Sequence, residues 1–376
     1  MAKKKGEKTT VEKPEVINVA DISKLINTVT NDVKKDFEVE TFDENFEYSF
    51  LSTGNPGINY AISNRFDGGF PEGLITEIAG ENATGKTLLA LHALVATQKK
   101  GGIAVLIDAE FAFNPLWFET LGGDPKALIH YQPRHIDDVY SFIGKVVEAT
   151  RKKSATVPLT IVYDSVAASP SKKEYEGAEY DMGKRAQGHG KGIRMLMGLC
   201  KAQSVTFIAI NQLRATFALY GLDKDTVGGA AWKYATSLRI HMKKGKKIKQ
   251  KMAVGEKIVG IAGSLVVNKS RLRAPFATAD FNVYYEGGID PLSGLYGVCR
   301  SEGIIQPAEK EDGGISKGWW VYKDVKFQEA SFAEKVLSKY PELLGGHALI
   351  DIPDASLLEI ESGDDDGDVN VNDALM

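Results

Sequence analysis

The chain has 376 residues, of which 43% are hydrophobic and 26% are charged, and its formal net charge at pH 7 is -4. This length exceeds one ordinary domain and suits one large core with a smaller appendage, and the composition excludes a wholly disordered or fibrous chain. The near-neutral charge does not by itself indicate nucleic-acid binding, which must depend on how the charge is distributed.

Cysteine content and the N-terminal sequence indicate a reducing compartment. Cys200 and Cys299 are too few for a disulfide scaffold or a four-cysteine zinc site. The start, MAKKKGEKTT, lacks the apolar stretch of a secretory signal, and no run of ~18 apolar residues could span a membrane. We therefore expect a soluble cytoplasmic protein that does not contact a membrane.

The N-terminal residues predict a disordered arm followed by a separate helix. Residues 1–15 are rich in Lys and Glu, and an acidic, extended stretch follows the helical pattern. We expect Asp21 to be the N-cap of this helix. We assign residues 1–44 to an arm whose helix docks on its own core or on a neighbouring subunit. The apolar side chains that recur on one helical face are Ile22, Leu25, Ile26, Val29, Val33 and Phe37.

The long middle part of the chain, residues 45–285, alternates between strand-like and helical patterns. Strands that alternate with helices favour an α/β fold with a mainly parallel sheet covered on both faces. The expected strands are 74–79, 103–107, 159–163, 205–210, 238–242 and 261–267, and the clearest helical patterns are 87–99 and 138–152.

After Gly287 the pattern changes to short pieces. Residues 319–327 predict a hairpin and residues 332–339 a helix, so we interpret residues 286–347 as a small α+β lobe. Residues 348–376 hold nine acidic residues and no Lys or Arg, which predicts a disordered acidic tail.

Basic residues are also unevenly distributed. Residues 243–251, KKGKKIKQK, contain six lysines. The near-neutral total charge therefore hides basic patches that the acidic tail balances.

The strongest motif is a phosphate-binding loop. The sequence GENATGKT matches G-x-x-x-x-G-K-[ST] and lies between an apolar strand and a helix, so a chance match is the weaker interpretation. Backbone N–H groups of such a loop surround phosphates, Lys86 can reach the β- and γ-phosphates, and the Thr87 hydroxyl can ligate Mg²⁺. The loop consists of Gly80, Glu81, Asn82, Ala83, Thr84, Gly85, Lys86 and Thr87.

Two further apolar strands end in carboxylates. The strand LTIVY ends at Asp164, where a Walker-B acid would hold Mg²⁺. The strand IAVLI is followed by Asp108 and Glu110. We expect Glu110 to be the base that orients and polarises the attacking water, and Asp108 to cap the following turn.

A third strand, VTFIAI, ends in two amides, Asn211 and Gln212. A neutral hydrogen-bonding group near a γ-phosphate can distinguish ATP from ADP, although a structural amide is the alternative when this strand is taken alone. Ligands of open α/β sheets bind at the carboxyl ends of the strands. Together, these strand ends predict a single nucleotide site.

In this order, the motifs resemble those of the RecA family of DNA strand-exchange recombinases. The phosphate-binding loop, DAEF, IVYDS and INQLR are followed by VGGAAWKYATSLRI, LVVNKSRLRAPF and YYEGGID, and the resemblance covers residues 52–340. A hexameric helicase would share the phosphate-binding loop and the Walker-B acid but not normally this whole series. The resemblance implies a RecA-type P-loop ATPase core.

The resemblance also implies roles at the nucleotide. Glu110 is similar to the family's catalytic carboxylate, and Gln212 to the γ-phosphate sensor that links ATP to a DNA-binding loop. Trp117 lies where the family has an aromatic that stacks on adenine. Asn114 lies where an acid usually contacts the adenine edge.

A second group of positions resembles the family's subunit interface. Lys269 and Arg271 match two basic residues that reach the ATP of the adjacent subunit. The second is Arg rather than the usual Lys, and its planar guanidinium suits bidentate contact with phosphate.

Two DNA-binding loops are implied as well. The first, residues 182–194, is glycine-rich and basic, and from its residues alone a solvated surface turn is an equal alternative. Its expected phosphate contacts are Lys184, Arg185, Lys191 and Arg194. The second, residues 214–229, is followed by Ala230 where the family usually has Asn. Its expected contacts with bases and phosphates are Phe217, Tyr220, Gly228 and Gly229.

The function implied is that of an ATP- and Mg²⁺-dependent recombinase. It would form a helical homo-oligomer on single-stranded DNA, pair with homologous duplex DNA and exchange strands, with DNA-stimulated hydrolysis at subunit interfaces. Single-strand-binding and mediator proteins are further expected partners. Two alternatives remain: a RecA-fold hexameric helicase, which NKSRLRAPF and GGAAWKY disfavour, and a slowly hydrolysing ATP-gated DNA-binding filament, which Glu110 disfavours.

Overall fold

The computed structural model describes residues 19–37, 47–217, 222–226, 228–253, 255–311, 313–346 and 358–360. It divides into two units, Met1–Tyr48 and Ser49–Met376. No helix among these described residues is long and apolar enough to cross a membrane.

The first unit contains helix α1 (Val19–Val33). The helix begins two residues before Asp21, so the prediction that Asp21 is the N-cap is wrong. The backbone of Val19 and Ala20 is already helical, and Asp21 therefore lies in the first turn, where the helix dipole favours a carboxylate. The apolar side chains of this helix are exposed within their unit.

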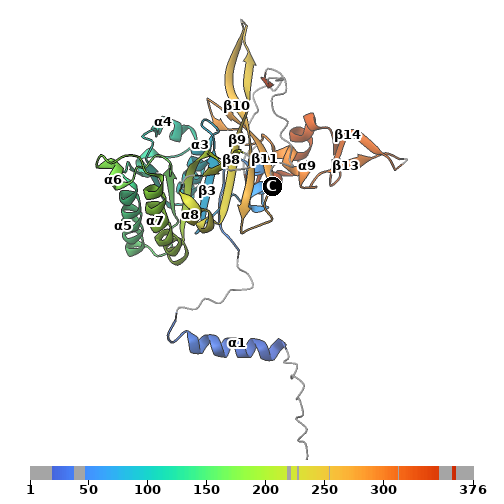
Figure 1. Ribbon diagram of the computed structural model, residues 1–376. Coiled ribbons are helices and arrows are strands. Elements are labelled where there is room, and N and C mark those ends of the chain that lie inside the picture. The colour runs from blue at the N-terminus through green and yellow to red at the C-terminus, as the bar shows by residue number, and fades with distance from the viewer. Residues whose placement is uncertain are drawn as a thin grey trace, which may run out of the picture. The chain divides into compact units, whose positions relative to one another are not determined.

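The core of the second unit is a mixed sheet whose central strands are parallel (Figure 1). Its main path has the order β12-β11-β10-β9-β3-β7-β6-β4-β5, and the α/β class with a mainly parallel sheet is confirmed. The strand pairs from β9 to β5 are parallel, whereas β9 to β12 pair antiparallel. The central strands are β3 (Ile75–Gly80), β4 (Ile103–Asp108), β5 (Leu128–Tyr131), β6 (Leu159–Asp164) and β7 (Val205–Phe217).

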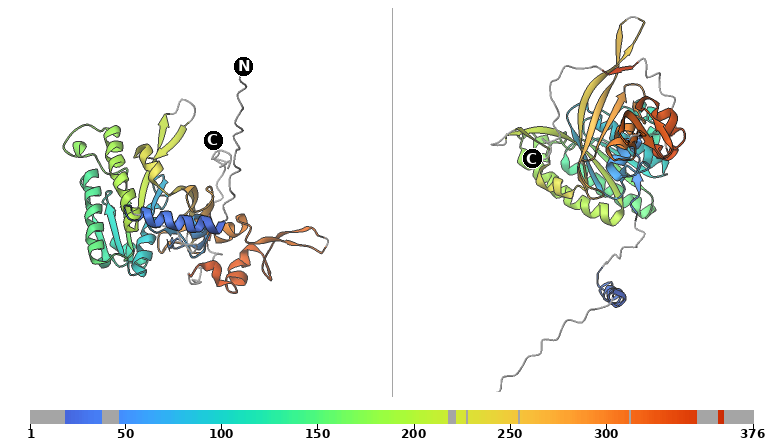
Figure 2. Two further views of the ribbon diagram at one scale, coloured as in Figure 1. Left: turned by 90° about the horizontal axis from the view of Figure 1, so that it is seen from below. Right: turned by 90° about the vertical axis from the view of Figure 1, so that its right-hand side faces the viewer.

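Helices cover both faces of this sheet because alternate strand residues point to opposite sides. In β4, Ala104 and Leu106 pack in the hydrophobic cluster that contains α3 (Lys86–Lys99). Val105 and Ile107 pack in a second cluster with α5 (Ile136–Lys153) and α7 (Met182–Gln203). Both helices predicted in this region therefore occur, at α3 and α5, and Figure 2 shows α5 and α7 side by side.

A long antiparallel hairpin extends from the sheet at the top of Figure 1. It is formed by β9 (Leu238–Lys251) and β10 (Glu256–Ser270), which are much longer than the predicted strands because their pairing continues past the sheet. All six lysines of residues 243–251 lie in β9.

The predicted acidic tail is not wholly without structure. Leu358–Ile360 form a short strand, β16, which pairs antiparallel with β9 at Ile248–Gln250. Pairing of β9 with β3 stops at Met242, so this edge of β9 is open to another strand. The rest of the predicted tail, residues 348–357 and 361–376, lies outside the described residues.

The C-terminal part of the unit has its own three-stranded sheet and hydrophobic cluster. The predicted hairpin is confirmed by β14 (Ile315–Tyr322) and β15 (Val325–Phe327), with β13 (Gln306–Glu309) on the other edge of β14. The helix predicted at 332–339 occurs as a shorter π-helical turn, Ala333–Leu337, and a 3₁₀ turn, Glu329–Ser331, precedes it.

The remaining elements connect these parts. They are β1 (Phe50–Leu51), α2 (Pro56–Ser63), β2 (Phe70–Pro71), α4 (Pro115–Thr120), a 3₁₀ turn (Pro125–Ala127), α6 (Lys172–Tyr175), β8 (Leu222–Thr226), α8 (Gly229–Ala235), β11 (Thr278–Tyr284), β12 (Gly288–Ile289), α9 (Leu295–Ser301) and a 3₁₀ turn (Pro341–Leu344).

Candidate functional site

The phosphate-binding loop joins the end of β3 to the start of α3. A Cβ atom at Gly80 would lie 2.6 Å from the carbonyl oxygen of Met242, so this close approach requires glycine. Gly85 has a φ of +88°, a left-handed conformation that glycine adopts without steric cost. The loop thereby presents backbone N–H groups at a helix N-terminus, the usual arrangement for binding phosphate.

Lys86 is held inside this loop. Its Nζ donates a 2.6 Å hydrogen bond to the carbonyl oxygen of Glu81, and its side chain is buried. Burial lowers the pKa of Lys86, while the carboxylates of Asp164 and Glu110 act in the opposite direction. The ammonium is thus positioned by the loop itself.

The two predicted magnesium ligands lie in contact. The Thr87 hydroxyl donates a 2.7 Å hydrogen bond to Asp164 Oδ2, and Oδ1 of this carboxylate is buried with no hydrogen-bond partner among the described residues. Burial raises the pKa of Asp164 to about 6, with Glu110 and Asp108 adding repulsion. A buried carboxylate oxygen without a partner beside a threonine hydroxyl fits Mg²⁺, which prefers oxygen ligands.

The predicted catalytic carboxylate lies at the same sheet edge. Glu110, just past β4, accepts a 2.6 Å hydrogen bond from the Ser165 hydroxyl and a 3.4 Å hydrogen bond from Gln212 Nε2, both at Oε1. The ends of β4 and β6 therefore meet the part of β7 at which its pairing with β3 ends, and Glu110 and Gln212 come into contact there. The side chain of Glu110 is exposed to the site and open to water.

Asp108 has the structural role expected of it. Its carboxylate accepts hydrogen bonds from the backbone N–H groups of Ala112 and Phe113, each at 3.2 Å, and lies 3.3 Å from His130 Nε2. It therefore fixes the turn that leads into α4.

Lys86, Thr87, Glu110, Asp164 and Gln212 line a cavity of about 700 Å³. Asn114 and Trp117 line the same cavity, and their expected contacts with adenine stay a prediction. The Oδ1 atom of Asn114 already accepts the N–H of Leu116 as the N-cap of α4, which leaves its NH₂ group as the donor available to a ligand.

Residues from the antiparallel part of the sheet complete the cavity. Ile261 in β10, Val283 in β11 and Tyr285 just after β11 also line it, and none of them is predicted from the sequence. Tyr285 lies within YYEGGID, so the motif that carries the resemblance could have indicated it.

The two predicted interface cations do not line this cavity. Lys269 Nζ donates a 2.8 Å hydrogen bond to the carbonyl oxygen of Lys233, and Arg271 Nη2 donates a 3.3 Å hydrogen bond to that of Tyr234. Both carbonyls belong to the last turn of α8, where cations are favoured. The pKa of Lys269 is lowered by burial and by the nearby guanidinium groups of Arg271 and Arg239.

The first predicted DNA-binding loop is instead the start of a helix. Residues 182–194 belong to α7, and Asp181 caps it by accepting hydrogen bonds from Gly183 N and Lys184 N. One of its glycines serves packing rather than flexibility, because a Cβ at Gly192 would lie 2.2 Å from the ring of Tyr140 in α5. The glycine-rich pattern was therefore wrongly interpreted as a loop.

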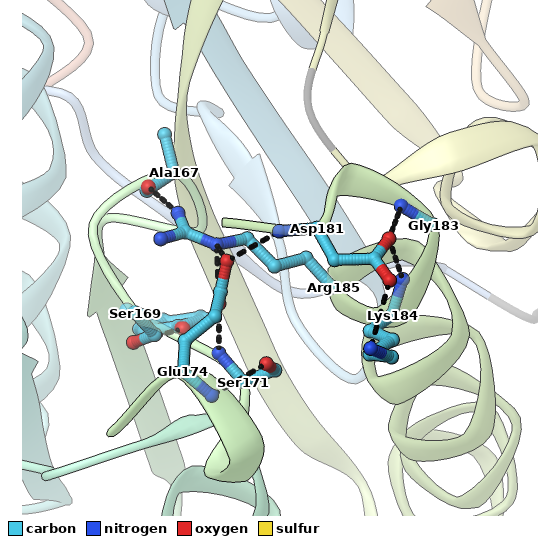
Figure 3. Close-up of polar contacts among 9 residues, drawn as sticks. Ala167, Ser169, Ser171, Glu174, Asp181, Gly183, Lys184 and Arg185 are labelled. Carbon is cyan, nitrogen blue, oxygen red and sulfur yellow. Dashed lines mark hydrogen bonds and ion pairs between the residues drawn. The ribbon is translucent and has the colours of Figure 1, made fainter. Parts of the chain in front are cut away.

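Arg185 does not extend freely from this helix (Figure 3). It forms an enclosed ion pair with Glu174, at 2.9 Å, and donates to the carbonyl oxygen of Ala167. Burial opposes ionisation of Glu174, but hydrogen bonds from Asp181 N, Ser171 N and Arg185 outweigh it and lower the pKa of Glu174 to about 2. The prediction that Arg185 contacts DNA phosphates is not supported by this geometry.

The other three predicted cations lie on one face of α7. Lys184, Lys191 and Arg194 are spaced seven and three residues apart, which places them on the same side of a helix, and all three are exposed. Lys184 forms only an exposed ion pair with Asp181. These side chains make a basic strip available to phosphates.

The second predicted loop is in part a hairpin. Strand β7 continues to Phe217 and pairs antiparallel with β8, with Leu213 opposite Thr226. The side chain of Phe217 and all of Tyr220 lie outside what the structure describes. Gly228 and Gly229 have positive φ values and begin α8, so the helix N-terminus follows the hairpin.

Comparisons with known proteins agree on one family. Residues 24–290 match the family model described as RecA N-terminal domain. The chain is 34% identical to Protein RecA of Chlorobaculum tepidum over 90% of this chain and 94% of that protein. It is 34% identical to Protein RecA of Thermotoga maritima over 78% of this chain and 80% of that protein. It is 37% identical to Protein RecA of Chlorobaculum parvum over 69% of this chain and 72% of that protein.

Proposed function

Since this chain belongs to the RecA family of DNA recombinases, we propose that it is an ATP-dependent recombinase that forms a helical filament on single-stranded DNA. In this state it pairs with homologous duplex DNA and exchanges strands. Its ATPase is stimulated by DNA. Copies of itself and the two DNA forms are its main partners, with single-strand-binding and mediator proteins as further ones.

The observation that carries the proposal is that the ends of β3, β4 and β6 meet Gln212 of β7 at one cavity. Lys86 binds the β- and γ-phosphates, and Thr87 and Asp164 hold Mg²⁺, which neutralises charge on the phosphate oxygens when it is bound. Glu110 accepts the proton of the attacking water, and the Ser165 hydroxyl fixes the orientation of its carboxylate.

Coupling to DNA follows from the course of β7. Gln212 contacts Glu110, and the same strand continues directly into the hairpin with β8. A change at the γ-phosphate that displaces Gln212 therefore acts on the hairpin that belongs to the second DNA-binding segment. The basic strip Lys184, Lys191 and Arg194 supplies sequence-independent contacts with the DNA backbone.

Assembly follows from the interface cations. Lys269, in β10, and Arg271, just after it, do not line the cavity of their own subunit and donate hydrogen bonds to carbonyl oxygens of α8 instead. In a filament they reach the nucleotide of the neighbouring subunit, so that ATP binding stabilises the assembly.

Two measurements test this proposal. ATP turnover is measured with and without single-stranded DNA, and negative-stain images are taken with single-stranded DNA and a nonhydrolysable ATP analogue. Stimulated turnover with helical filaments supports a recombinase. Closed six-membered rings that unwind duplexes would indicate the helicase, and filaments without measurable turnover would indicate the ATP-gated binding protein.

A further inference from the structure

A fully buried glutamate lies in the centre of the sheet. Glu77 is in β3, and its side chain has no exposed surface. Its neighbours in register are Ala209 in β7 and Arg239 in β9. A buried carboxylate is costly unless it is paired and hydrogen-bonded, so its partners indicate why it is there.

Both carboxylate oxygens of Glu77 have a partner on a different strand. Asn211 Nδ2 donates a 2.8 Å hydrogen bond to Oε1, and Arg239 Nε contacts Oε2 at 2.5 Å. The Arg239 side chain is only 14% exposed. Glu77 therefore connects β7 on one side of β3 to β9 on the other.

On the β7 side, this hydrogen-bond network reaches the candidate nucleotide site. Asn211 Oδ1 accepts the backbone N–H of Gln212 at 2.9 Å, and the Gln212 side chain contacts Glu110. Any movement of Gln212 along β7 consequently strains the hydrogen bond between Asn211 and Glu77.

On the β9 side, the network reaches the second DNA-binding segment. Arg239 Nη2 donates a 3.0 Å hydrogen bond to the Thr226 hydroxyl, at the end of β8, two residues before Gly228. Arg239 also lies opposite Lys269 across the β9–β10 pair. One guanidinium thus contacts the return strand of the hairpin and adjoins an interface cation.

We propose that the Glu77–Arg239 ion pair is a positioning element that couples nucleotide binding to DNA binding by fixing both strands of the β7–β8 hairpin to β3. This inference rests on the proposed function. In the enclosed sheet the pair resists separation, so β7 and β8 shift together rather than independently. Without it, Gln212 still binds nucleotide but no longer sets the position of Thr226.

Two substitutions test the element from different sides. Glu77→Gln keeps the shape and removes the charge, and Thr226→Val removes the hydrogen bond from Arg239 while leaving the ion pair intact. Glu302→Gln is the control, because it breaks another partly buried ion pair, with Arg273, whose side chains are 24% (Glu302) and 16% (Arg273) exposed. Circular dichroism and thermal melting first establish that each variant is folded.

The measurement is the affinity for fluorescein-labelled oligo(dT), without nucleotide and with Mg²⁺ and a nonhydrolysable ATP analogue, at one salt concentration. The ratio of the two dissociation constants is the coupling factor, and the affinity for the analogue with and without DNA must give the same factor. We expect Glu77→Gln and Thr226→Val to lower this factor by about fivefold or more, while analogue affinity without DNA changes less than about threefold.

Three outcomes decide the matter. A reduced factor in both variants with an unchanged factor in Glu302→Gln supports the proposal, and if Glu77→Gln does not fold, Thr226→Val alone decides. An unchanged factor in the folded variants, or an equal loss in the control, would overturn it in favour of a merely structural ion pair. If the wild-type protein binds oligo(dT) with the same affinity with and without the ATP analogue, that result would instead overturn the proposed function.

Discussion

The hydroxyl of Thr87 and the carboxylate of Asp164, which are 77 positions apart in the chain, lie 2.7 Å apart. This contact joins the phosphate-binding loop to the end of β6. It places the two expected Mg²⁺ ligands together, and it leaves Asp164 Oδ1 buried without a partner among the described residues. At the proposed cation site, the charge therefore depends on the protonation of one carboxyl group.

The first prediction concerns pH. Because burial raises the pKa of Asp164 to about 6, this carboxyl is charged above that value and becomes neutral below it. Affinity for Mg²⁺-ATP should be constant near pH 7.5 and fall by up to about tenfold per pH unit below 6. Titration with a fluorescent ATP analogue at several pH values measures this. Asp164→Asn should bind weakly with no such dependence, and an equally steep loss in that variant would assign it to another group.

The second prediction concerns Lys86. Lys86→Ala removes the ammonium that the loop positions, so we expect turnover to fall by about 10²-fold or more and ATP-dependent assembly to be lost. Lys86→Arg should bind ATP yet fail to turn it over. Equilibrium binding and phosphate release distinguish the two variants. Wild-type affinity and turnover in Lys86→Ala would mean that this cavity is not the ATP site.

The third prediction concerns Glu110. Glu110→Gln keeps a group that the Ser165 hydroxyl can contact but removes the base, so hydrolysis should slow by about 10²-fold or more. Binding of ATP and single-stranded DNA should persist, and filaments should last longer. Single-turnover hydrolysis and timed electron micrographs measure these effects. Rapid turnover would assign the base to another residue.

The fourth prediction concerns the subunit interface. Lys269→Ala and Arg271→Ala should each retain weak DNA binding and lose its stimulation by ATP, since these cations would act on the neighbour's nucleotide. A filament that mixes Lys86→Ala with Arg271→Ala contains some intact sites, so mixing should recover part of the turnover. Absence of recovery at every ratio, with co-assembly demonstrated, would argue against a shared site.

The candidate nucleotide site could be predicted from the sequence because its residues lie directly beside local sequence patterns. The apolar residues before Asp164 and Gln212 show that each polar side chain follows a buried strand segment. Parallel strands then bring these polar side chains to the same edge of the sheet. Tyr285 is not predicted from local patterns because it follows β11, an antiparallel strand whose pairing with the core is not visible in the sequence.

The structure of the two segments proposed to bind DNA is harder to predict from the sequence, because tertiary packing decides it. Glycines such as Gly192 indicated a loop, yet this glycine allows α7 to approach Tyr140 in α5. Arg185 has the sequence context of a free cation, but it forms an ion pair with Glu174, eleven residues earlier in the chain. No short sequence pattern indicates either of these two contacts.

The last prediction concerns the C-terminal acidic residues. Nine carboxylates in residues 348–376 repel DNA phosphates, and β16 brings Leu358–Ile360 onto β9 beside its exposed lysines. Truncation after Ile350 should therefore strengthen binding to duplex DNA more than binding to single-stranded DNA. The effect should shrink as salt rises from 0.1 to 1 M, because the Debye length falls from about 10 Å to about 3 Å.

A second variant distinguishes the effect of β16 pairing with β9 from the effect of the acidic charges themselves. Leu358→Pro, with Ile360→Pro, should prevent β16 from pairing with β9 while leaving every carboxylate in place. Duplex titrations of full-length, truncated and proline-substituted protein at two salt concentrations compare the two contributions. Proline substitution that reproduces most of the truncation effect would show that docking on β9 holds the acidic residues near the lysines. If truncation leaves duplex affinity at low salt unchanged, the acidic residues serve solubility alone.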